Sequence, residues 1–286
     1  MSLARTIVRR VVPRAVRNWV RAPGVTWRRL ADEVRFWAGH RPRVALRPDW
    51  NVSCHPAAVR GGYQAYRDDP AQAAELAAFV RSATPSMVLF DLGAHFGAFS
   101  LAALHFGGAG ARAVAVEPSP TAVRMLERQA TLNGVEQRLE VVQAAVGDHA
   151  GTMPMIPVGV IAAGYYVAPD GEHETRETRL VPVVTVDALA SQLGLTPTHL
   201  KIDVEGAEAA ALRGARQVLR GSHPPLVFLE LHVGLIRARG GDAMEPVRLL
   251  ADARYQAEDW DGRPLPDAEL LAQPLVRFQA RPSAAA

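Results

Sequence analysis

The 286-residue sequence contains one cysteine, one lysine and no long apolar run. The single cysteine, Cys54, excludes an internal disulfide and a cysteine-built metal site, and its NVSCHP surroundings predict a buried or inert thiol in a loop. No apolar run reaches the roughly 18 residues of a membrane-spanning helix. No apolar signal core with a small-residue cleavage site is found at the start. We therefore expect a cytoplasmic protein without a membrane span.

Acidic residues are scarce at the start of the chain. Residues 1–47 hold twelve arginines and two acids, Asp32 and Glu33, giving +10 (12 − 2), so the other 239 residues carry −7 (3 − 10). We predict an arginine-rich helical extension over residues 1–60 and one domain over 61–286. The extension is interpreted as docked on the domain, as a contact to an anionic membrane or a protein partner, or as a transit peptide. The acidic body argues against nucleic-acid binding.

The dinucleotide fingerprint Gly-x-Gly-x-x-Gly is also absent. In its place residues 87–100, MVLFDLGAHFGAFS, form an apolar run that reaches Asp91 and continues through Gly93 and Gly97 into a helical pattern. A pyrophosphate needs close backbone approach at the second glycine of that fingerprint, whereas S-adenosylmethionine carries no phosphate. The stretch therefore favours S-adenosylmethionine over a nicotinamide dinucleotide, although an ordinary strand-to-helix turn would use the same glycines.

A second apolar run, RAVAVEP, ends in Glu117. A carboxylate can accept two hydrogen bonds from a ribose diol. Glu117 follows Gly93 by 24 residues (117 − 93), close to the offset of about 20 expected of a ribose-binding acid in such a unit. We predict that Glu117 binds the ribose of a nucleoside.

Apolar runs alternate with helical patterns along the rest of the chain. Strands joined by helices pair in parallel, and apolar runs without alternation belong to a sheet that is covered on both faces. Residues 151–180 interrupt this rhythm with prolines, glycines and a charged run, which is typical of an insertion. Its Tyr165, Tyr166 and His173 predict a lid or acceptor wall, or else the insertion's own small core.

Several blocks of the sequence resemble one family. FDLGAHFGAFSL, AVEPSPTAVRMLERQATLNG, KIDVEGAEAAALRGA and LVFLELH, within about residues 86–232, are similar to the FkbM family of S-adenosylmethionine-dependent methyltransferases. One departure is His95, where the family usually has asparagine. The resemblance implies an α/β fold of the Rossmann-like class I methyltransferase type, with a mostly parallel seven-stranded sheet and helices on both faces. It also implies O-methylation of a hydroxyl on a sugar, glycolipid or secondary metabolite.

Polar residues gather at the predicted carboxyl ends of apolar strands. Ligands of open α/β sheets bind beyond these ends, and charged groups rarely stay there unless they are paired or used. Asp148 would reach the adenine amino group or only stabilise a turn, and Glu205 would face the acceptor or only begin a helix. The predicted site binds the donor through Asp91, Gly93, His95, Gly97, Glu117 and Asp148 and catalyses through His232, Asp203 and Glu205.

His232 is the predicted general base, because the unperturbed pKa of imidazole lies near neutrality. A structural histidine bonded to Glu230 is the alternative, and Lys201 is expected to pair with Asp203 or Glu205. Asp203, Glu230 and His232 have the ligand types of a magnesium or manganese site, but their spacing is not diagnostic and no metal is predicted. A nicotinamide-dependent enzyme and a non-catalytic cofactor-binding or interaction protein remain alternatives. The expected partner is a small-molecule or carbohydrate acceptor.

Overall fold

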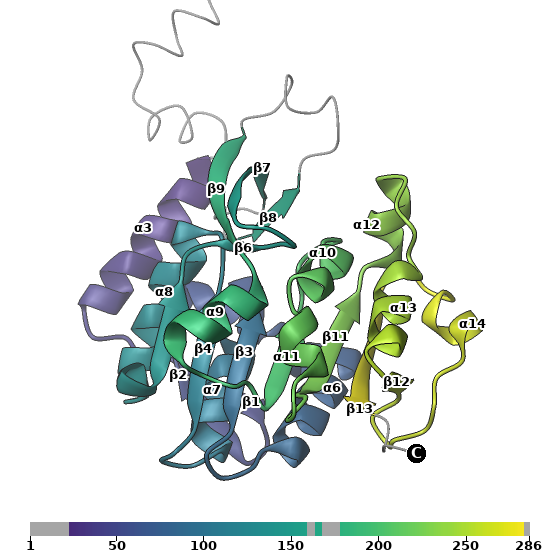
Figure 1. Cartoon of the computed structure of the whole chain (residues 1–286). Helices are drawn as coiled ribbons and strands as arrows, with labels where there is room; N and C mark the ends of the chain where they lie inside the picture. Colours follow the sequence, from purple (N-terminus) through teal and green to yellow (C-terminus); the bar gives the residue numbers. More distant parts are fainter. Residues whose placement is uncertain (1–22, 159–163, 168–177, 283–286) are drawn as a thin grey trace, which may run out of the picture.

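The computed structural model describes residues 23–158, 164–167 and 178–282. Within these residues a seven-stranded sheet forms the centre of the molecule, in the order β12–β13–β11–β10–β3–β4–β5 (Figure 1). In this order β11, β10, β3, β4 and β5 are each parallel to their neighbours, whereas β13 runs antiparallel to both β11 and β12. The predicted mostly parallel seven-stranded sheet is thus confirmed. Its strands are Val88–Leu92 (β3), Arg112–Val116 (β4), Leu139–Val142 (β5), His199–Ile202 (β10), Leu226–Leu231 (β11), Tyr255–Glu258 (β12) and Val276–Pro282 (β13).

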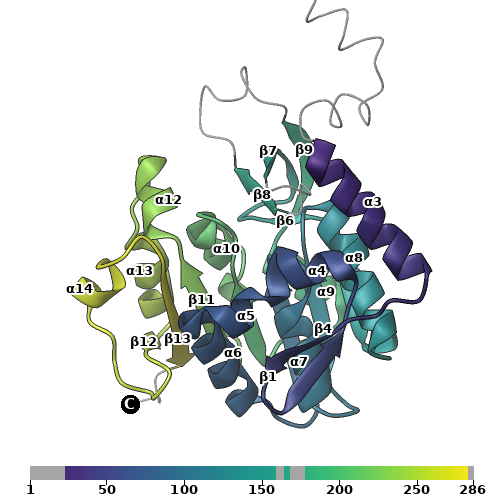
Figure 2. The ribbon, with the colours of Figure 1, turned by 180° about the vertical axis from the view of Figure 1, so that it is seen from behind.

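Each face of the sheet has its own apolar core, because successive side chains of a strand point to opposite faces. On β3, Leu89 belongs to one core and Phe90 and Leu92 belong to the other. Figures 1 and 2 show the two helical layers from opposite sides. The first core is covered by α6 (Pro70–Ser82), α7 (Ala98–Phe106) and α8 (Pro120–Leu132), and the second by α9 (Val186–Leu193), α10 (Glu208–Arg213), α11 (Arg216–Arg220) and α13 (Glu245–Asp252).

Local signals in the sequence set the starts of two of these helices. Asp69 accepts a hydrogen bond from the Ala71 N–H at 2.9 Å, and Ser119 accepts one from the Ala122 N–H at 3.3 Å. In both helices a proline follows at the first helical position, where its missing N–H costs nothing. The chain therefore turns sharply after β4 and leaves Glu117 at the edge of the sheet.

A hairpin that precedes the sheet in the sequence is part of the first core. Strands β1 (Arg43–Arg47) and β2 (Trp50–Ser53) pair in antiparallel fashion and bury Leu46 and Val52 among the core residues. Cys54 is buried as expected, although the residues just before it form a strand and not a loop. The predicted domain boundary at residue 60 therefore lies inside a packed unit.

The predicted insertion forms part of a second, smaller sheet in the order β6–β9–β7–β8. The apolar run over residues 139–146 reads as one strand in the sequence but is interrupted: β5 ends at Val142, and β6 (Ala145–Val146) pairs with β9 (Arg179–Val184). Strands β7 (Gly151–Val158) and β8 (Gly164–Val167) form a hairpin beyond the carboxyl ends of the central strands (Figure 1). Tyr165 and Tyr166 lie on β8, and His173 lies outside the described residues.

The remaining helices lie at the periphery. The helix α3 (Pro23–Trp37) packs beside α4 along the outside of the molecule (Figure 2). Among the described residues, no helix combines the length and the apolar character needed to cross a membrane. The other short elements are α4 (Pro56–Ala58), the π-helix Val59–Tyr63, α5 (Ala65–Asp68), the 3-10 turn Glu136–Arg138, α12 (Val233–Ala238) and α14 (Asp267–Leu270).

Candidate active site

A cavity of about 400 Å³ opens at the carboxyl ends of β3, β4, β10 and β11. Seven of the nine predicted site residues line it, namely Asp91, Gly93, His95, Glu117, Asp203, Glu205 and His232. Gly97 and Asp148 are not among the described residues of its wall. The structure therefore brings most of the predicted site together at the edge of the sheet where open α/β folds bind ligands.

The turn between β3 and α7 depends on two glycines with positive φ angles, +82° at Gly93 and +80° at Gly97. A Cβ on Gly93 would lie 1.8 Å from the backbone oxygen of Asp203, and a Cβ on Gly97 would lie 2.0 Å from the Leu126 side chain. Gly93 thus lets two strand ends meet at the cavity. Gly97 instead allows α7 to pack against α8, so its role is structural and not that of a wall residue.

Asp91 joins the end of β3 to the first turn of α7. Its carboxylate accepts hydrogen bonds from the Ser100 hydroxyl at 2.6 Å and the Ser100 N–H at 3.0 Å. Burial raises the pKa of Asp91, while the bonds from Ser100 favour the ionised form. The predicted role of orienting the glycine turn agrees with this geometry.

Glu117 is held rigidly with its carboxylate on the cavity wall. One oxygen accepts from the His95 N–H at 2.9 Å and the other accepts from the Ser119 N–H at 2.7 Å. Burial raises the pKa of Glu117 to about 8, although the two backbone N–H donors act to lower it. Each oxygen has a further lone pair for a ligand hydroxyl. The His95 ring stacks on Phe96 with centroids 3.9 Å apart, and burial lowers its pKa to about 4, so it is neutral near pH 7.

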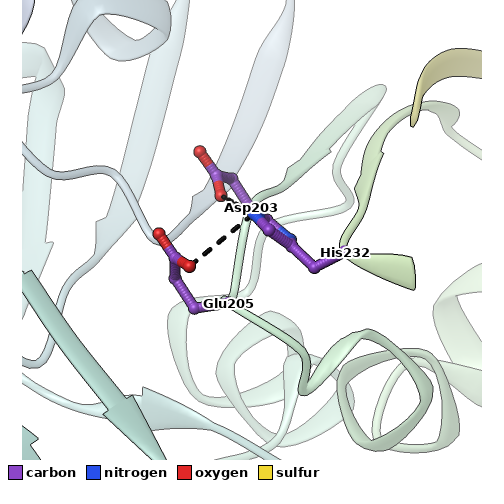
Figure 3. Close-up of side chains that lie close together, drawn as sticks. All are labelled: Asp203, Glu205 and His232. Atoms are coloured by element: carbon purple, nitrogen blue, oxygen red, sulfur yellow. Dashed lines mark ion pairs between the residues drawn. The ribbon is translucent and has the colours of Figure 1, made fainter. Parts of the chain in front are cut away.

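Asp203, Glu205 and His232 converge at the other end of the cavity (Figure 3). His232 Nε2 lies 3.7 Å from Asp203 Oδ1 and 3.7 Å from Glu205 Oε2. His232 Nδ1 lies 2.7 Å from an oxygen of Glu208, which is fully buried. The predicted alternative that His232 bonds to Glu230 is therefore wrong, because Glu208 at the start of α10 takes that place.

The charges around His232 change its expected chemistry. Burial lowers the pKa of His232, but the bond to Glu208 and the charges of Asp203 and Glu205 outweigh burial and raise it to about 9. The prediction of a neutral general base is thus wrong for this resting site, because the imidazole is already protonated near pH 7. Burial and the charge of Glu230 raise the pKa of Asp203 to about 7. Asp203 is therefore the better proton acceptor.

A second charged cluster lies on the same wall and involves the only lysine of the sequence. Lys201 Nζ is 3.0 Å from Glu75 and 3.0 Å from Glu230, and Arg277 Nη2 is 2.9 Å from Glu230. Burial alone would raise the pKa of Glu230, but the two cations lower it to about 2. Lys201 therefore pairs with Glu75 and Glu230, and not with Asp203 or Glu205 as predicted, because its side chain points to the side of the sheet on which α6 packs.

Asp148 lies away from this cavity. It accepts a hydrogen bond from Arg213 Nε at 3.0 Å and lies 2.6 Å from His149 Nδ1, in a separate depression beside α9. The prediction that Asp148 reaches the adenine amino group is not supported, because the chain turns away from the central sheet at β6. The alternative of a turn residue fits its position.

Some wall residues could not be located from the motifs. Glu75, the fully buried partner of Lys201 and not itself a wall residue, carried a readable signal, since a lone lysine in an apolar strand requires a buried acid and Glu75 is the acid within the otherwise apolar run of α6. The wall residues without such a signal lie on α5, α6 and β7 and at the start of β13, and they include Tyr66, Gln72, Met153, Met155, Leu275 and Arg277.

Comparisons with known proteins list methyltransferases among the solved structures that are similar to this chain. A precorrin-6y C5,15-methyltransferase from Geobacter metallireducens is 15% identical with a TM-score of 0.41 over 74% of this chain and 86% of its own. An O-methyltransferase from Bacillus cereus in complex with SAH is 13% identical with a TM-score of 0.41 over 74% of this chain and 80% of its own. Comparison with curated proteins gave no match.

A family model described as the methyltransferase FkbM domain matches residues 91–256, more than half of the chain. This match includes the glycine turn, Glu117 and the cluster of Asp203, Glu205 and His232. The Rossmann-like class I methyltransferase fold that the motifs imply is confirmed. The chain therefore belongs to the FkbM family of methyltransferases, whose methyl donor is S-adenosylmethionine.

Proposed function

We propose that this methyltransferase methylates a hydroxyl oxygen of a small polar acceptor, of the kind carried by a sugar, a glycolipid or a secondary metabolite. One observation carries the proposal: a Cβ on Gly93 would lie 1.8 Å from the backbone oxygen of Asp203. The glycine turn and the acidic cluster are thus packed directly together. An acceptor held at Asp203 stands next to a methyl group held at the turn, which is the proximity that transfer requires.

The charge of the cavity suits a cationic donor. Five acids line it, namely Asp91, Glu117, Asp203, Glu205 and Glu230. The cations Lys201 and Arg277 are engaged with Glu75 and Glu230. Because these two cations, and the protonated His232 beside Glu208, are each engaged by an acid, the described wall favours a sulfonium over the two phosphates of a dinucleotide. Glu117 would hold the ribose, and the Gly93 turn would hold the amino-acid end of the donor.

The acidic cluster supplies the proton chemistry. Bound S-adenosylmethionine offers a methyl group on a positively charged sulfur, and the acceptor oxygen that takes this methyl must lose its proton. Asp203, with a pKa of about 7, can accept that proton near neutral pH. His232 Nε2 lies 3.7 Å from a carboxylate oxygen of Asp203 and 3.7 Å from one of Glu205, so its charge acts on both acids.

The acceptor end of the wall favours a neutral polyol. Tyr66, Gln72 and Arg277 line the cavity beside the acids. A phenol, an amide and a guanidinium can hydrogen-bond several hydroxyls, and an aromatic ring can pack on the apolar face of a sugar. The acids Asp203 and Glu205 at this end disfavour an acceptor that carries a phosphate or carboxylate near the reacting oxygen.

Calorimetry and product analysis test the proposal. We expect S-adenosylmethionine and its demethylated product to bind and NAD not to bind, and a panel of hydroxylated sugars, glycolipids and small metabolites to yield a methyl ether by mass spectrometry. Asp203→Asn should keep donor binding and lose turnover. Tight NAD binding without S-adenosylmethionine binding would establish the nicotinamide alternative. Donor binding without product from any panel member would favour the non-catalytic alternative.

A further inference from the structure

We propose that Asp203, Glu205 and His232 bind a divalent cation, best matched by Mn²⁺, at the acceptor end of the cavity (Figure 3). The binding site stands on its own geometry, and its catalytic meaning rests on the proposed function. Each of the three side chains offers one ligand atom, and these atoms all lie within 4.8 Å of one another. Two carboxylates with one imidazole suit Mn²⁺, because oxygen ligands favour hard cations and imidazole favours the later transition metals.

The distances fit an ion better than direct hydrogen bonds. A charge-assisted hydrogen bond would bring His232 Nε2 to about 2.8 Å from a carboxylate oxygen. Instead Nε2 lies 3.7 Å from both Asp203 Oδ1 and Glu205 Oε2. Two ligand atoms that are each about 2.1 Å from one ion lie about 3.0 Å apart at a right angle and about 4.2 Å apart when opposite. The two 3.7 Å distances from His232 Nε2 lie between these limits, and the carboxylate oxygens of Asp203 and Glu205 lie within 4.8 Å of each other.

The orientation of His232 is set from outside the cluster. Its Nδ1 is 2.7 Å from Glu208, which is fully buried, and His232 itself is only 8% exposed. A ligating histidine typically donates its second N–H to a carboxylate, which fixes the ring and strengthens it as a ligand. Glu208 provides this support and leaves Nε2 directed at Asp203 and Glu205, and the proton that Nε2 carries in the metal-free site is released to solvent when the ion binds.

An ion at this position would act on the acceptor. The hydroxyl oxygen becomes a further ligand, which lowers its pKa and holds it next to the glycine turn. Figure 3 shows one oxygen of Asp203 turned toward His232 and the other turned away. The hydroxyl proton passes to that second oxygen, while the acceptor oxygen forms the bond to the methyl carbon and the donor sulfur keeps the electron pair of the broken bond.

Electron paramagnetic resonance of free Mn²⁺ tests the site without an activity assay. The full chain is stripped with EDTA, exchanged into metal-free buffer and titrated with MnCl₂. We expect one Mn²⁺ per chain and at least about a tenfold weaker affinity in Glu205→Gln. The Glu205 side chain is 52% exposed, so this variant should fold. His232→Ala should lose binding, and Asp148→Asn, which removes an acid outside the cavity, should match the wild type.

The outcomes separate this inference from the proposed function. Wild-type protein that leaves all Mn²⁺ free at millimolar concentration overturns the metal site, as does equal binding by Glu205→Gln and Asp148→Asn. Methyl transfer that proceeds unchanged in EDTA overturns the catalytic role of the ion and leaves methyl transfer itself intact. If Mn²⁺ binds as expected but S-adenosylmethionine does not, the proposed function fails and the metal site stands.

A separate observation concerns α3. We infer that its outer face binds an anionic lipid surface. Trp27, Leu30, Val34 and Trp37 follow one another at intervals of three, four and three residues, so they share one face of the helix. Their exposed fractions are 60%, 51%, 64% and 82%. Exposed tryptophans at both ends of an apolar stripe are typical of helices that lie in a membrane interface.

The charges around α3 match an anionic partner. Both acids of the helix are paired: the buried Asp32 with Arg60 at 2.5 Å, and Glu33, whose side chain is 38% exposed, with Arg128 at 2.9 Å. The Arg35 and Arg60 side chains are 62% and 53% exposed. The first 47 residues carry a net charge of +10 (12 − 2). Basic charge beside an apolar stripe, with both acids of the helix already paired, favours lipids with negative head groups.

Vesicle co-sedimentation tests this surface. We expect the full chain to bind vesicles that contain phosphatidylglycerol and to dissociate from them at high salt. It should not bind vesicles of pure phosphatidylcholine. A double variant with Trp27→Ser and Trp37→Ser should bind at least about tenfold more weakly, whereas Leu180→Ser, at an exposed leucine on β9, should bind normally. Equal binding by the double variant overturns the inference. A dimer that the double variant dissociates would instead assign the face to self-association.

Discussion

The two ends of the cavity are built in different ways. The donor end comes from one short stretch, in which β3, the glycine turn and β4 place Asp91, Gly93 and Glu117 through backbone hydrogen bonds and close backbone contact. The acceptor end is assembled from α6, β10, β11 and β13, and buried ion pairs such as Lys201–Glu230 hold it together. A compact turn can hold a constant donor, while scattered side chains can be exchanged to suit different acceptors.

The largest effect should come from Gly93→Ala, which damages both ends at once. The added Cβ would lie 1.8 Å from the backbone oxygen of Asp203, at a φ of +82°. We expect a loss of about 5 kcal/mol in the free energy of unfolding, since backbone overlap and positive φ add together. Gly108→Ala is the matched control, because φ is +70° there and nothing lies within 4 Å. Denaturant titration compares the two, and similar losses would mean that the contact at Gly93 is not decisive.

Lys201→Met should damage the acceptor end alone. Removal of the amine leaves Glu75 and Glu230 buried with less compensation, which costs about 3–5 kcal/mol of the free energy of unfolding. A double variant that adds Glu75→Gln should regain part of this loss, because one of the two acids is then neutral. Donor affinity of the folded fraction, measured by calorimetry, should stay near the wild-type value. A large loss of donor affinity would show that the two ends are not separable.

Glu117→Ala should damage the donor end alone. We expect donor binding to weaken by about 1.5–3 kcal/mol, the range of hydrogen bonds to a charged group. Glu140→Ala is the control, since Glu140 is an exposed acid on the neighbouring strand β5. Calorimetry with S-adenosylmethionine measures both variants. Unchanged affinity in Glu117→Ala would remove this carboxylate from the donor site.

The smallest effect is a pH dependence that arises at the acceptor end. The pKa of His232 is raised to about 9 in the folded protein, from about 6.5 in the unfolded chain. Its contribution to stability is therefore complete below pH 6.5 and is lost as the pH rises toward 9, at about 1 kcal/mol per pH unit. Unfolding in EDTA buffers should show this slope in the wild type and a shallower one in His232→Gln. Equal slopes would mean that His232 is not held as a cation.

Short-range patterns predicted the donor end and the core of the fold. The apolar runs located the central strands, and the glycine turn with Glu117 located the ribose-binding edge, because both depend on residues close in sequence. The apolar-periodic stretch over residues 206–219 reads as one helix in the sequence but forms two, α10 and α11, because a Cβ on Gly214 would lie 2.1 Å from the backbone oxygen of Gly147 and the chain turns there. Such a contact has no signature in the local sequence.

Partners of buried charges were the least predictable part of the site. Lys201 lies within β10, and Glu230 and His232 lie at the end of β11, where the sequence places them, but their partners Glu75, Arg277 and Glu208 lie on other elements. The position of a residue along a strand predicts the face of the sheet to which its side chain points, but it does not predict which residue of another element that side chain contacts. The pKa of His232, on which its role depends, was therefore beyond sequence reasoning.

The enclosure of Lys201 has a practical consequence. The only lysine of the sequence is 1% exposed and the only cysteine is 0% exposed. Acylating and alkylating reagents should therefore find no side-chain amine or thiol on the folded surface. Both groups become reactive only when the interior opens, so the rate of their labelling would count opening events directly, with no engineered probe.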